Sequence, residues 1–217
     1  MTARFFHICT MLCAAWLLFS TSCQNGESDP KVPQIFGDTL LIDVSGQQYI
    51  IKRFGNTLWM MENFRSTQDT RTIYVYDAIF PLEESKISYY GYLYNYQTAA
   101  ELQPQGWKLP GEVDLDELLY QIGITREMAG TFLKGDGDWT IKSDSTLMNF
   151  APAGLGRAIT HERVGYGNEC YFILSDNSDK TVKAAKMADE SQELTVGNHS
   201  KTDEYMTVRY IMHSPAN

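Results

Sequence analysis

The sequence predicts an α+β fold, and three observations lead to this prediction. Short runs rich in β-branched and aromatic residues, separated by glycine-containing turns, occupy residues 39–61. Two segments with helical spacing of apolar residues follow at 112–122 and 125–134. The last third returns to β-type runs, and strands followed by helices and then strands are typical of α+β domains. Its 217 residues, 43% of them apolar, suffice for one globular domain behind a short targeting segment.

The first β-type runs predict a meander. The expected strands are Thr39–Val44, Gln48–Phe54 and Thr57–Met61. Short turns at residues 45–46 and 55–56 join them, and such turns favour antiparallel hairpins. Residues 65–86 mix charged and aromatic side chains, and we expect a long surface excursion there.

Helices are predicted in the middle of the chain. A short one is expected from Asn95. The clearest runs from Glu112 to Ile122, with apolar residues at i, i+3, i+4 and i+7 and with Gly123 at its end. Thr125 can cap another, which should extend to about Lys134. Its expected inward residues are Met128, Ala129, Phe132 and Leu133.

Four further strands are predicted in the last third: Leu155–Thr160, Glu169–Leu174, Val182–Ala188 and Met206–Met212. The last of these is apolar and β-branched enough for a central strand.

The N-terminus predicts an export signal over residues 1–22. Arg4 is its basic residue, Ile8–Phe19 is an uncharged run, and the small residues Ser20–Ser22 precede Cys23. A twelve-residue run is too short to cross a ~30 Å hydrocarbon layer as a helix, which favours a cleaved signal. A cysteine at this place resembles the bacterial lipobox, in which the thiol is lipidated and becomes the first residue. Ser20 stands where the lipobox usually has leucine, so a plain secretory signal is the alternative.

Residues 23–37 are expected to be a flexible tether, and residues 38–217 the folded domain. The tether is polar and contains Pro30 and Pro33, a composition that cannot bury enough surface to fold. The whole chain carries a net charge of −9, and removal of Arg4 with the signal leaves about −10. This acidity argues against nucleic acid as a partner.

Cysteine usage leaves one thiol in the mature domain. Cys9 and Cys13 lie in the signal and Cys23 is the proposed lipid site, so Cys170 has no internal partner. An exported domain normally pairs its thiols. Cys170 lies in an apolar run, and we expect a buried structural thiol.

Several segments resemble one family. Leu58–Arg65 is similar to the "WMaeNLr" segment of the Fibrobacter succinogenes major paralogous domain, and Tyr90–Tyr96 to its "YGrLYnw" segment. Gly106–Pro110 resembles its "GWrLPt" turn. Leu133-Lys134, Trp139 and Phe150–Gly154 match in order, and Thr207–Arg209 resembles its closing "svRc" strand. The resemblance covers roughly residues 38–213.

The resemblance implies an exported lipoprotein with a C-type-lectin-like domain, built from two helices and a twisted, mostly antiparallel sheet. The family usually has one cysteine before "P-x-G-W" and another after the final "V-R". Gln103 and Tyr210 stand there in this sequence, which implies that a whole disulfide is missing.

No catalytic or metal motif is evident, so we expect no enzyme, no cofactor and no metal. The triplets that bind calcium and sugar in C-type lectins are absent, and formylglycine-generating relatives need reactive cysteines that this chain lacks. His161, His199 and His213 show no metal-ligand spacing. Paired carboxylates for glycoside hydrolysis leave no local signature, so that chemistry stays open.

Two acidic loops are the only cation candidates, and solvated turns explain both: Asp136 with Asp138, and Asp176 with Asp179.

Aromatic residues supply the candidate ligand contacts. Trp59, Trp107 and Trp139 fall inside the family-like segments and are expected in the core. Tyr74, Tyr76 and Phe80 lie outside those segments and are the candidate contact residues.

The functional expectation is a lipid-anchored, non-catalytic binding or adhesion module of the cell envelope, expected at the outer membrane, that contacts a glycan or a surface protein. A structural accessory subunit of a pilus or a glycan-uptake complex is the second hypothesis. A polysaccharide-active enzyme is the third.

Overall fold

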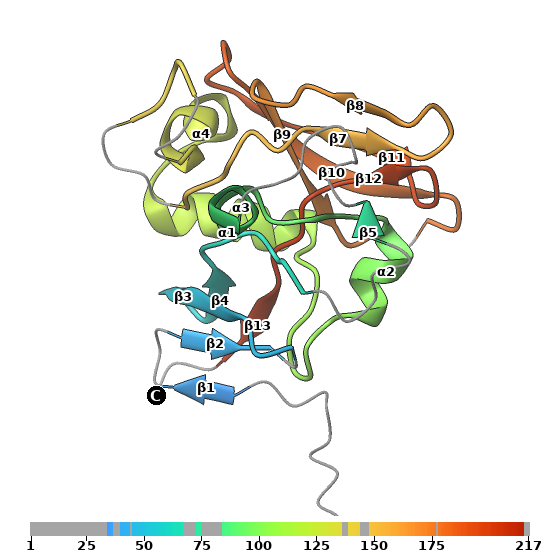
Figure 1. The fold of residues 1–217 in the computed structure, drawn as a ribbon. Coiled ribbons are helices and arrows are strands. Elements are labelled where there is room, and N and C mark those ends of the chain that lie inside the picture. Colours follow the sequence, from blue (N-terminus) through green and yellow to red (C-terminus); the bar gives the residue numbers. More distant parts are fainter. Residues whose placement is uncertain are drawn as a thin grey trace, which may run out of the picture.

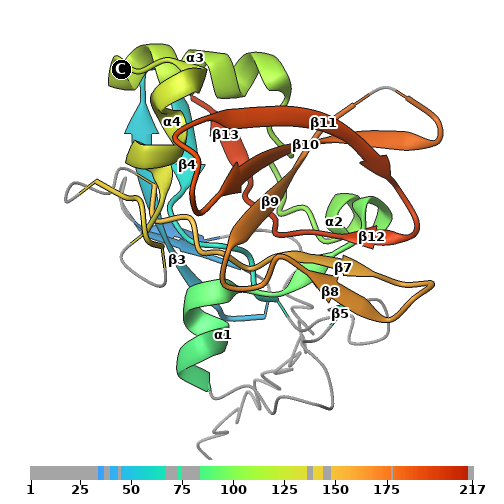
Figure 2. The ribbon, with the colours of Figure 1, turned by 90° about the horizontal axis from the view of Figure 1, so that it is seen from above.

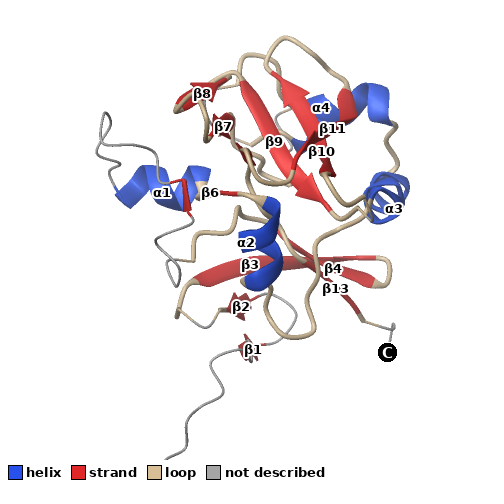
Figure 3. Ribbon diagram, turned by 90° about the vertical axis from the view of Figure 1, so that its right-hand side faces the viewer, coloured by secondary structure: helices blue, strands red, loops and turns tan. Residues whose placement is uncertain are grey.

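The computed structural model describes residues 34–36, 40–43, 45–66, 73–74, 84–135, 139–143, 148–176 and 178–214. They form a mixed α+β fold, as predicted. Figure 1 shows two groups of strands, with β1–β4 and β13 below and β7–β12 above. The α1, α2 and α3 helices flank the junction between the two groups (Figure 3).

The lower sheet has the strand order β1-β2-β3-β4-β13, and each strand is antiparallel to its neighbours. Its strands are β1 Gln34–Phe36, β2 Leu40–Ile42, β3 Gln48–Phe54, β4 Thr57–Met60 and β13 Ile211–His213. The predicted meander is confirmed. Asp43 fixes its first turn, because the carboxylate accepts hydrogen bonds from the Ser45 and Gln47 N–H groups (2.8 and 3.0 Å) and from the Tyr49 hydroxyl (2.9 Å).

The upper strands form two three-stranded antiparallel sheets, ordered β11-β10-β9 and β12-β7-β8. Their strands are β7 Leu155–Arg157, β8 Glu162–Val164, β9 Glu169–Leu174, β10 Thr181–Ala188, β11 Leu194–Ser200 and β12 Glu204–Tyr205. Figure 2 shows β9, β10 and β11 running next to one another across the top of the molecule. A two-stranded pair joins β5 Ile73–Tyr74 to β6 Leu93–Tyr94. The structure therefore has several small sheets where one sheet was expected.

Four helices lie in the described residues: α1 Glu84–Tyr90, α2 Tyr96–Glu101, α3 Glu112–Ile122 and α4 Arg126–Leu133. The short helix expected from Asn95 and the two longer helices are confirmed, and α1 was not predicted. The bounds of α3 agree with the prediction. Gly123 ends α3 in the left-handed conformation (φ 74°), and Asp114 accepts a hydrogen bond from the Gly111 N–H (2.7 Å) at its start. None of these helices is both long enough and apolar enough to span a membrane.

The inward face of α4 differs from the prediction at Met128, which is 47% exposed. Gly130 faces the segment just before β11, and its N–H donates to the Gln192 carbonyl there (2.8 Å). Residues two apart on a helix point in nearly opposite directions. The close approach of Gly130 to β11 therefore turns Met128 outward, while Ala129 and Leu133 are buried as expected.

The stretch 206–213 joins the two groups of strands. A single central strand over Met206–Met212 was predicted, and that prediction is wrong: only Ile211–His213 forms a regular strand. Met206 pairs with Tyr94, and Thr207 exchanges hydrogen bonds with β9. The Val208 and Tyr210 carbonyls accept from the Phe64 and Met60 N–H groups (2.8 and 3.2 Å). The stretch is buried as a central strand would be, but it changes partners along its length.

Two large apolar clusters fill the interior and share the β9–β10 pair. One face of this pair places Tyr171, Ile173, Val182 and Ala184 against the lower sheet. The other face packs Cys170, Phe172, Leu174, Ala185 and Met187 with α3, α4 and Trp59. The expected core positions of Trp59, Trp107 and Trp139 are confirmed, since each is at most 4% exposed.

Candidate functional site

Arg209 is the centre of a buried polar network. Its side chain is fully buried, and its guanidinium donates to the Asn63 side-chain oxygen and the Asn149 carbonyl (both 2.9 Å) and to the Met148 carbonyl. The guanidinium carbon lies 3.8 Å from the centre of the Phe150 ring. Burial lowers the pKa of Arg209 to about 9. The network joins three family-like segments inside the domain: Asn63, Phe150 and Arg209 come from one each. We call this buried network the frame; its role is structural, and it is not a surface for ligands.

Cys170 is a structural thiol, as expected. It is fully buried, and burial raises its pKa to about 12. A thiol that stays protonated and excluded from solvent is a poor nucleophile and a poor metal ligand.

The frame supports a rigid loop at residues 165–169, between β8 and β9. The Gly167 N–H donates to the Pro152 carbonyl (2.9 Å), and the Glu169 carbonyl accepts from the Gly154 N–H (2.7 Å). Gly165 has φ 70°, and a Cβ there would collide with the Glu169 side chain. The Phe150–Gly154 segment therefore holds this loop in place.

A second rigid element faces the loop: the turn at 189–191, between β10 and β11. The ammonium of Lys134, a residue with no exposed surface, donates to the Asp189 and Ser191 carbonyls (3.0 and 2.9 Å). It also lies 4.9 Å from the centre of the Trp139 ring. The Asp189 N–H donates to the Asn168 carbonyl (2.7 Å), which joins turn and loop. Lys134 is thus a buried cation that positions a surface turn.

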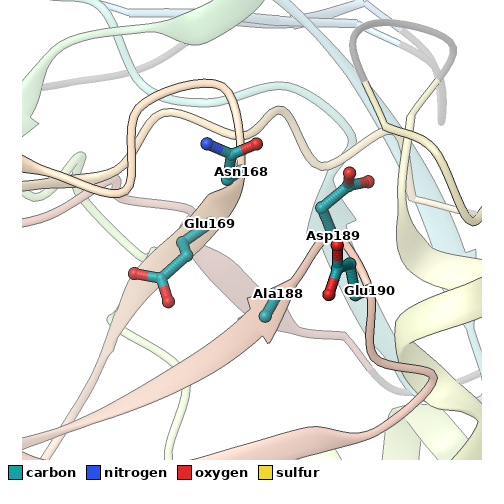
Figure 4. Close-up of a pocket in the computed structure, with 5 residues that line it drawn as sticks. All are labelled: Asn168, Glu169, Ala188, Asp189 and Glu190. Atoms are coloured by element: carbon teal, nitrogen blue, oxygen red, sulfur yellow. The ribbon is translucent and has the colours of Figure 1, made fainter.

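Between them lies an open groove of about 370 Å³, lined by Asn168, Glu169, Ala188, Asp189 and Glu190. Figure 4 shows the loop residues on one side, the turn residues on the other and Ala188 between them. We call these five residues the loop–turn groove. The side chains of its lining residues are three carboxylates, one amide and one methyl group.

Two of the groove carboxylates have internal partners. Glu169 pairs with Lys186 (2.6 Å) and accepts a hydrogen bond from the Tyr171 hydroxyl (2.8 Å). Burial alone would raise the pKa of Glu169, but the hydrogen bonds from Lys186 and Tyr171 outweigh it and lower that pKa. Burial also opposes ionisation of Asp189, yet hydrogen bonds from Thr140 and Ile141 lower its pKa. Both groups are therefore ionised hydrogen-bond acceptors.

The loop at residues 165–169 also carries an exposed tyrosine. Tyr166 lies two residues before Asn168 in the same loop, and it is not one of the five residues that line the groove. Tyr166 is 40% exposed, and its ring packs against Tyr90 (5.1 Å between ring centres), with the Arg163 guanidinium carbon 3.9 Å from the ring centre. Gly165 and Gly167, which flank it, both have positive φ. Sequence reasoning missed Tyr166, and a Gly-Tyr-Gly turn between two short strands was the available signal.

The structure does not bring together the candidate ligand-contact and cation-binding residues that the sequence suggested. Tyr74 lies in β5, paired with Leu93, while Tyr76, Phe80, Asp136, Asp138 and Cys23 are outside the described residues. Asp176 is half-buried and Asp179 is exposed. Within the described part of the chain, no three His, Cys, Asp or Glu side chains are placed to hold a metal ion.

One histidine lies between a hydroxyl and a carboxylate, an arrangement also found in catalytic triads. His213 Nδ1 lies 3.1 Å from the Thr57 hydroxyl, and its Nε2 lies 2.9 Å from an Asp114 oxygen. Thr57 is a buried strand residue, and Asp114 also binds Lys108 and the Gly111 N–H. The arrangement ties β4 and β13 to α3, and it offers no accessible nucleophile.

The fold and the groove define a small α+β domain with a pre-formed polar surface site. Residues 53–212 match the family model of the Fibrobacter succinogenes major domain. The chain therefore belongs to this family, as the resemblance of its segments indicated. No similar curated protein and no similar solved structure was found.

Proposed function

We propose that this protein is a lipid-anchored binding module of the bacterial cell envelope, and that it contacts its ligand through the loop–turn groove and Tyr166. The observation that carries the proposal is the support of both groove walls. Residues of the family-like segments, Pro152 and Gly154 on one side and Lys134 on the other, hold the two walls by hydrogen bonds. Such support lowers the ordering cost of binding. The C-type-lectin-like fold belongs to this proposal.

A non-catalytic role fits the chemistry of the groove. Glycoside hydrolysis needs a carboxylic acid whose pKa is raised, so that it can donate a proton at neutral pH. In Glu169 and Asp189 the pKa is lowered instead, and their oxygens already accept hydrogen bonds from the protein. We infer binding without turnover.

The anchor in this proposal is a lipid on Cys23, such as a diacylglyceryl group with palmitate, which holds the domain at the outer membrane. Two or three acyl chains suffice for stable attachment, because each buried methylene contributes ~0.8 kcal/mol. The tether was predicted over residues 23–37, but Gln34–Phe36 form β1 and pair with β2, so the proposed tether ends before Gln34. In this proposal it gives the domain freedom to reach a glycan or a surface protein.

The proposal is tested with the full chain, purified from membranes in detergent, on a glycan array and on a panel of immobilised envelope and matrix proteins. We expect binding to at least one class, and we expect Tyr166→Ala to weaken it. Tyr120→Ala is the matched control, because Tyr120 is 78% exposed on α3 and does not line the groove. A well-folded chain that binds nothing on either surface would refute the proposal.

A further inference from the structure

We propose that the open centre of the β11 edge binds a short extended peptide, which carries an aromatic residue opposite Gly197 and a basic residue on the side of Glu193. We call residues 195–199 the β11 edge site. None of them lines the loop–turn groove, so this surface and its partner go beyond the proposed function.

β11 is the outer strand of its sheet, which has the order β11-β10-β9 (Figure 2). The Lys201 N–H donates to the Lys180 carbonyl, in line with the register of β10 and β11. Hydrogen bonds alternate along an antiparallel ladder, so the odd-numbered residues of β11 bond to β10 and the even-numbered residues direct their N–H and C=O groups outward. Within the described part of the chain, no hydrogen bond engages these outward groups at Val196 and Asn198.

Both ends of this edge are closed. Leu194 is only 1% exposed, and the outward carbonyl of Gln192 accepts from the Gly130 N–H of α4 (2.8 Å). At the other end, the Ser200 N–H donates to the Glu204 carboxylate (2.8 Å). The open part is therefore a short slot between two fixed ends.

The centre of the slot lacks the usual protection of a sheet edge. Charged side chains, proline or a β-bulge commonly prevent strand addition. Residues 195–199 contain no acidic residue, lysine, arginine or proline, and the pairing of β11 with β10 runs without a bulge. The two outward residues offer two donors and two acceptors in the spacing of an extended backbone. Another extended peptide is the partner that complements them.

Gly197 lies in the middle of the slot. Its φ is not positive, and a Cβ there would meet no described atom closer than His199 Nε2 at 3.8 Å, so neither conformation nor packing requires glycine. In a regular strand, glycine often marks the close approach of another backbone or a ligand. An added antiparallel strand would form a non-hydrogen-bonded pair at Gly197, where opposite side chains lie closest. A large aromatic side chain of the peptide fills that space.

Charge selects the residue that follows the aromatic one. Glu193 is exposed, and among the described residues no ion pair engages it. In an antiparallel peptide, the residue two positions after the aromatic one lies opposite Thr195 and diagonal to Glu193, within reach of a long side chain. The net charge of −9 adds to the preference for a basic residue there.

The test uses the acetylated and amidated peptide Thr-Val-Tyr-Val-Lys, titrated to millimolar concentration into the full chain in detergent and followed by amide NMR. We expect saturable binding. N-methylation of both valine amides should abolish it, because these amides face Val196 and Asn198. N-methylation of the tyrosine amide, which points away from β11, should keep the affinity within about threefold, and glutamate in place of the peptide's lysine should weaken binding at least threefold.

Variants of the chain test the same site. Gly197→Val fills the space for the aromatic side chain and should weaken binding roughly tenfold, whereas the matched control Asn198→Ala keeps the outward N–H and should stay within about threefold. Hydrogen exchange of the unaltered chain gives a measurement that needs no variant. The Val196 and Asn198 amides should exchange quickly in the free chain and slowly with peptide, while the Gly197 amide, bonded to β10, is protected in both.

The remaining outcomes contradict the inference. Absence of binding at millimolar peptide, or equal binding of the peptide methylated at both valines, overturns the β11 edge site. A dimer of the unaltered chain that protects the Val196 and Asn198 amides shows that a second copy occupies the edge, and overturns the peptide assignment. Tyr166→Ala should leave peptide binding unchanged, so failure here is distinguishable from failure of the proposed function.

Discussion

At the scale of single residues, the buried cations carry most of the specificity of the fold. Among the described residues, no carboxylate accepts a hydrogen bond from Arg209. Its guanidinium donates instead to the Asn63 side chain and to the Met60, Met148 and Asn149 carbonyls. Lys134 is satisfied by the Asp189 and Ser191 carbonyls in the same way. Each cation fixes the path of a loop that local propensity leaves undefined.

The Arg209→Met variant should be strongly destabilised. Removal of the guanidinium leaves the Met148 and Asn149 carbonyls and the Asn63 side chain without their hydrogen-bond donor inside the protein. Such losses cost about 3–5 kcal/mol of folding free energy. Urea denaturation followed by tryptophan fluorescence measures the free energy of unfolding. Arg157→Met, at an exposed position of β7, is the control and should change it by less than about 0.5 kcal/mol. Equal effects of the two variants would contradict the role of Arg209.

Tyr210 provides a prediction for alkaline pH. Its hydroxyl donates to the Ala99 carbonyl (2.6 Å), and burial raises its pKa well above the ordinary value near 10. Above pH ~10 the unfolded chain releases this proton while the folded chain keeps it, so stability is lost as pH rises. Tyr210→Phe should cost about 1 kcal/mol at pH 7, and the difference from the unaltered chain should shrink above pH ~10. Denaturation midpoints from pH 7 to 11 measure this; a constant difference would disprove it.

At the scale of elements, prediction from sequence succeeded where the signal was local. The bounds of α3 follow from the apolar spacing within its eleven residues and from Gly123. Their prediction therefore required no knowledge of contacts with residues distant in sequence. The stretch 206–213 shows the limit, because its apolar character correctly indicates burial but not which strands it meets. Its partners include Tyr94, Phe172 and Trp59, from three separate regions of the chain.

The groove could not be predicted for a related reason. Its walls lie some twenty residues apart in sequence, and they meet because Asp189 pairs with Asn168 at the end of the β9–β10 ladder. Tyr74, Tyr76 and Phe80 were predicted from local aromatic density and from their place outside the family-like segments, and neither signal carries information about exposure. Tyr166 had only its two flanking glycines to indicate that its ring is presented outward.

Gly91 shows how tightly one element passes another. It has φ 70°, and a Cβ there would lie 2.6 Å from the Asn63 Cβ and 2.9 Å from the Phe64 carbonyl oxygen. Gly91→Ala should therefore cost about 2–4 kcal/mol, from strained backbone and a forced shift of the segment after β4. Gly123→Ala is the control, because Gly123 has a similar φ but open space around it, and it should cost only about 1–2 kcal/mol. Thermal unfolding compares the two; a smaller loss at Gly91 would contradict the close approach.

At the scale of the whole molecule, hydrogen bonds and apolar packing take the place of a disulfide. Gln103 and Tyr210 stand where the resemblance places a disulfide, and each now makes a hydrogen bond: Gln103 accepts from the Leu109 N–H (3.3 Å), and Tyr210 donates to Ala99. The fully buried stretch 206–211 then unites the two groups of strands into one interior. Cys170 is a buried packing residue, so Cys23 is the cysteine of the proposed mature chain for which we propose a chemical role.

Cys23→Ser tests that role without touching the fold. We expect the variant to move from the membrane fraction to the soluble or secreted fraction and to lose metabolic labelling by an alkynyl palmitate analogue, because the thiol is the acceptor of the lipid. Its far-ultraviolet circular dichroism and unfolding midpoint should match those of the unaltered domain, since Cys23 precedes the residues 53–212 that match the family model. Cys170→Ala is the matched control: it removes the other mature thiol and should leave both labelling and membrane attachment intact. A Cys23→Ser chain that stays with the membrane after a carbonate wash would show that something other than a lipid on this cysteine holds the protein there.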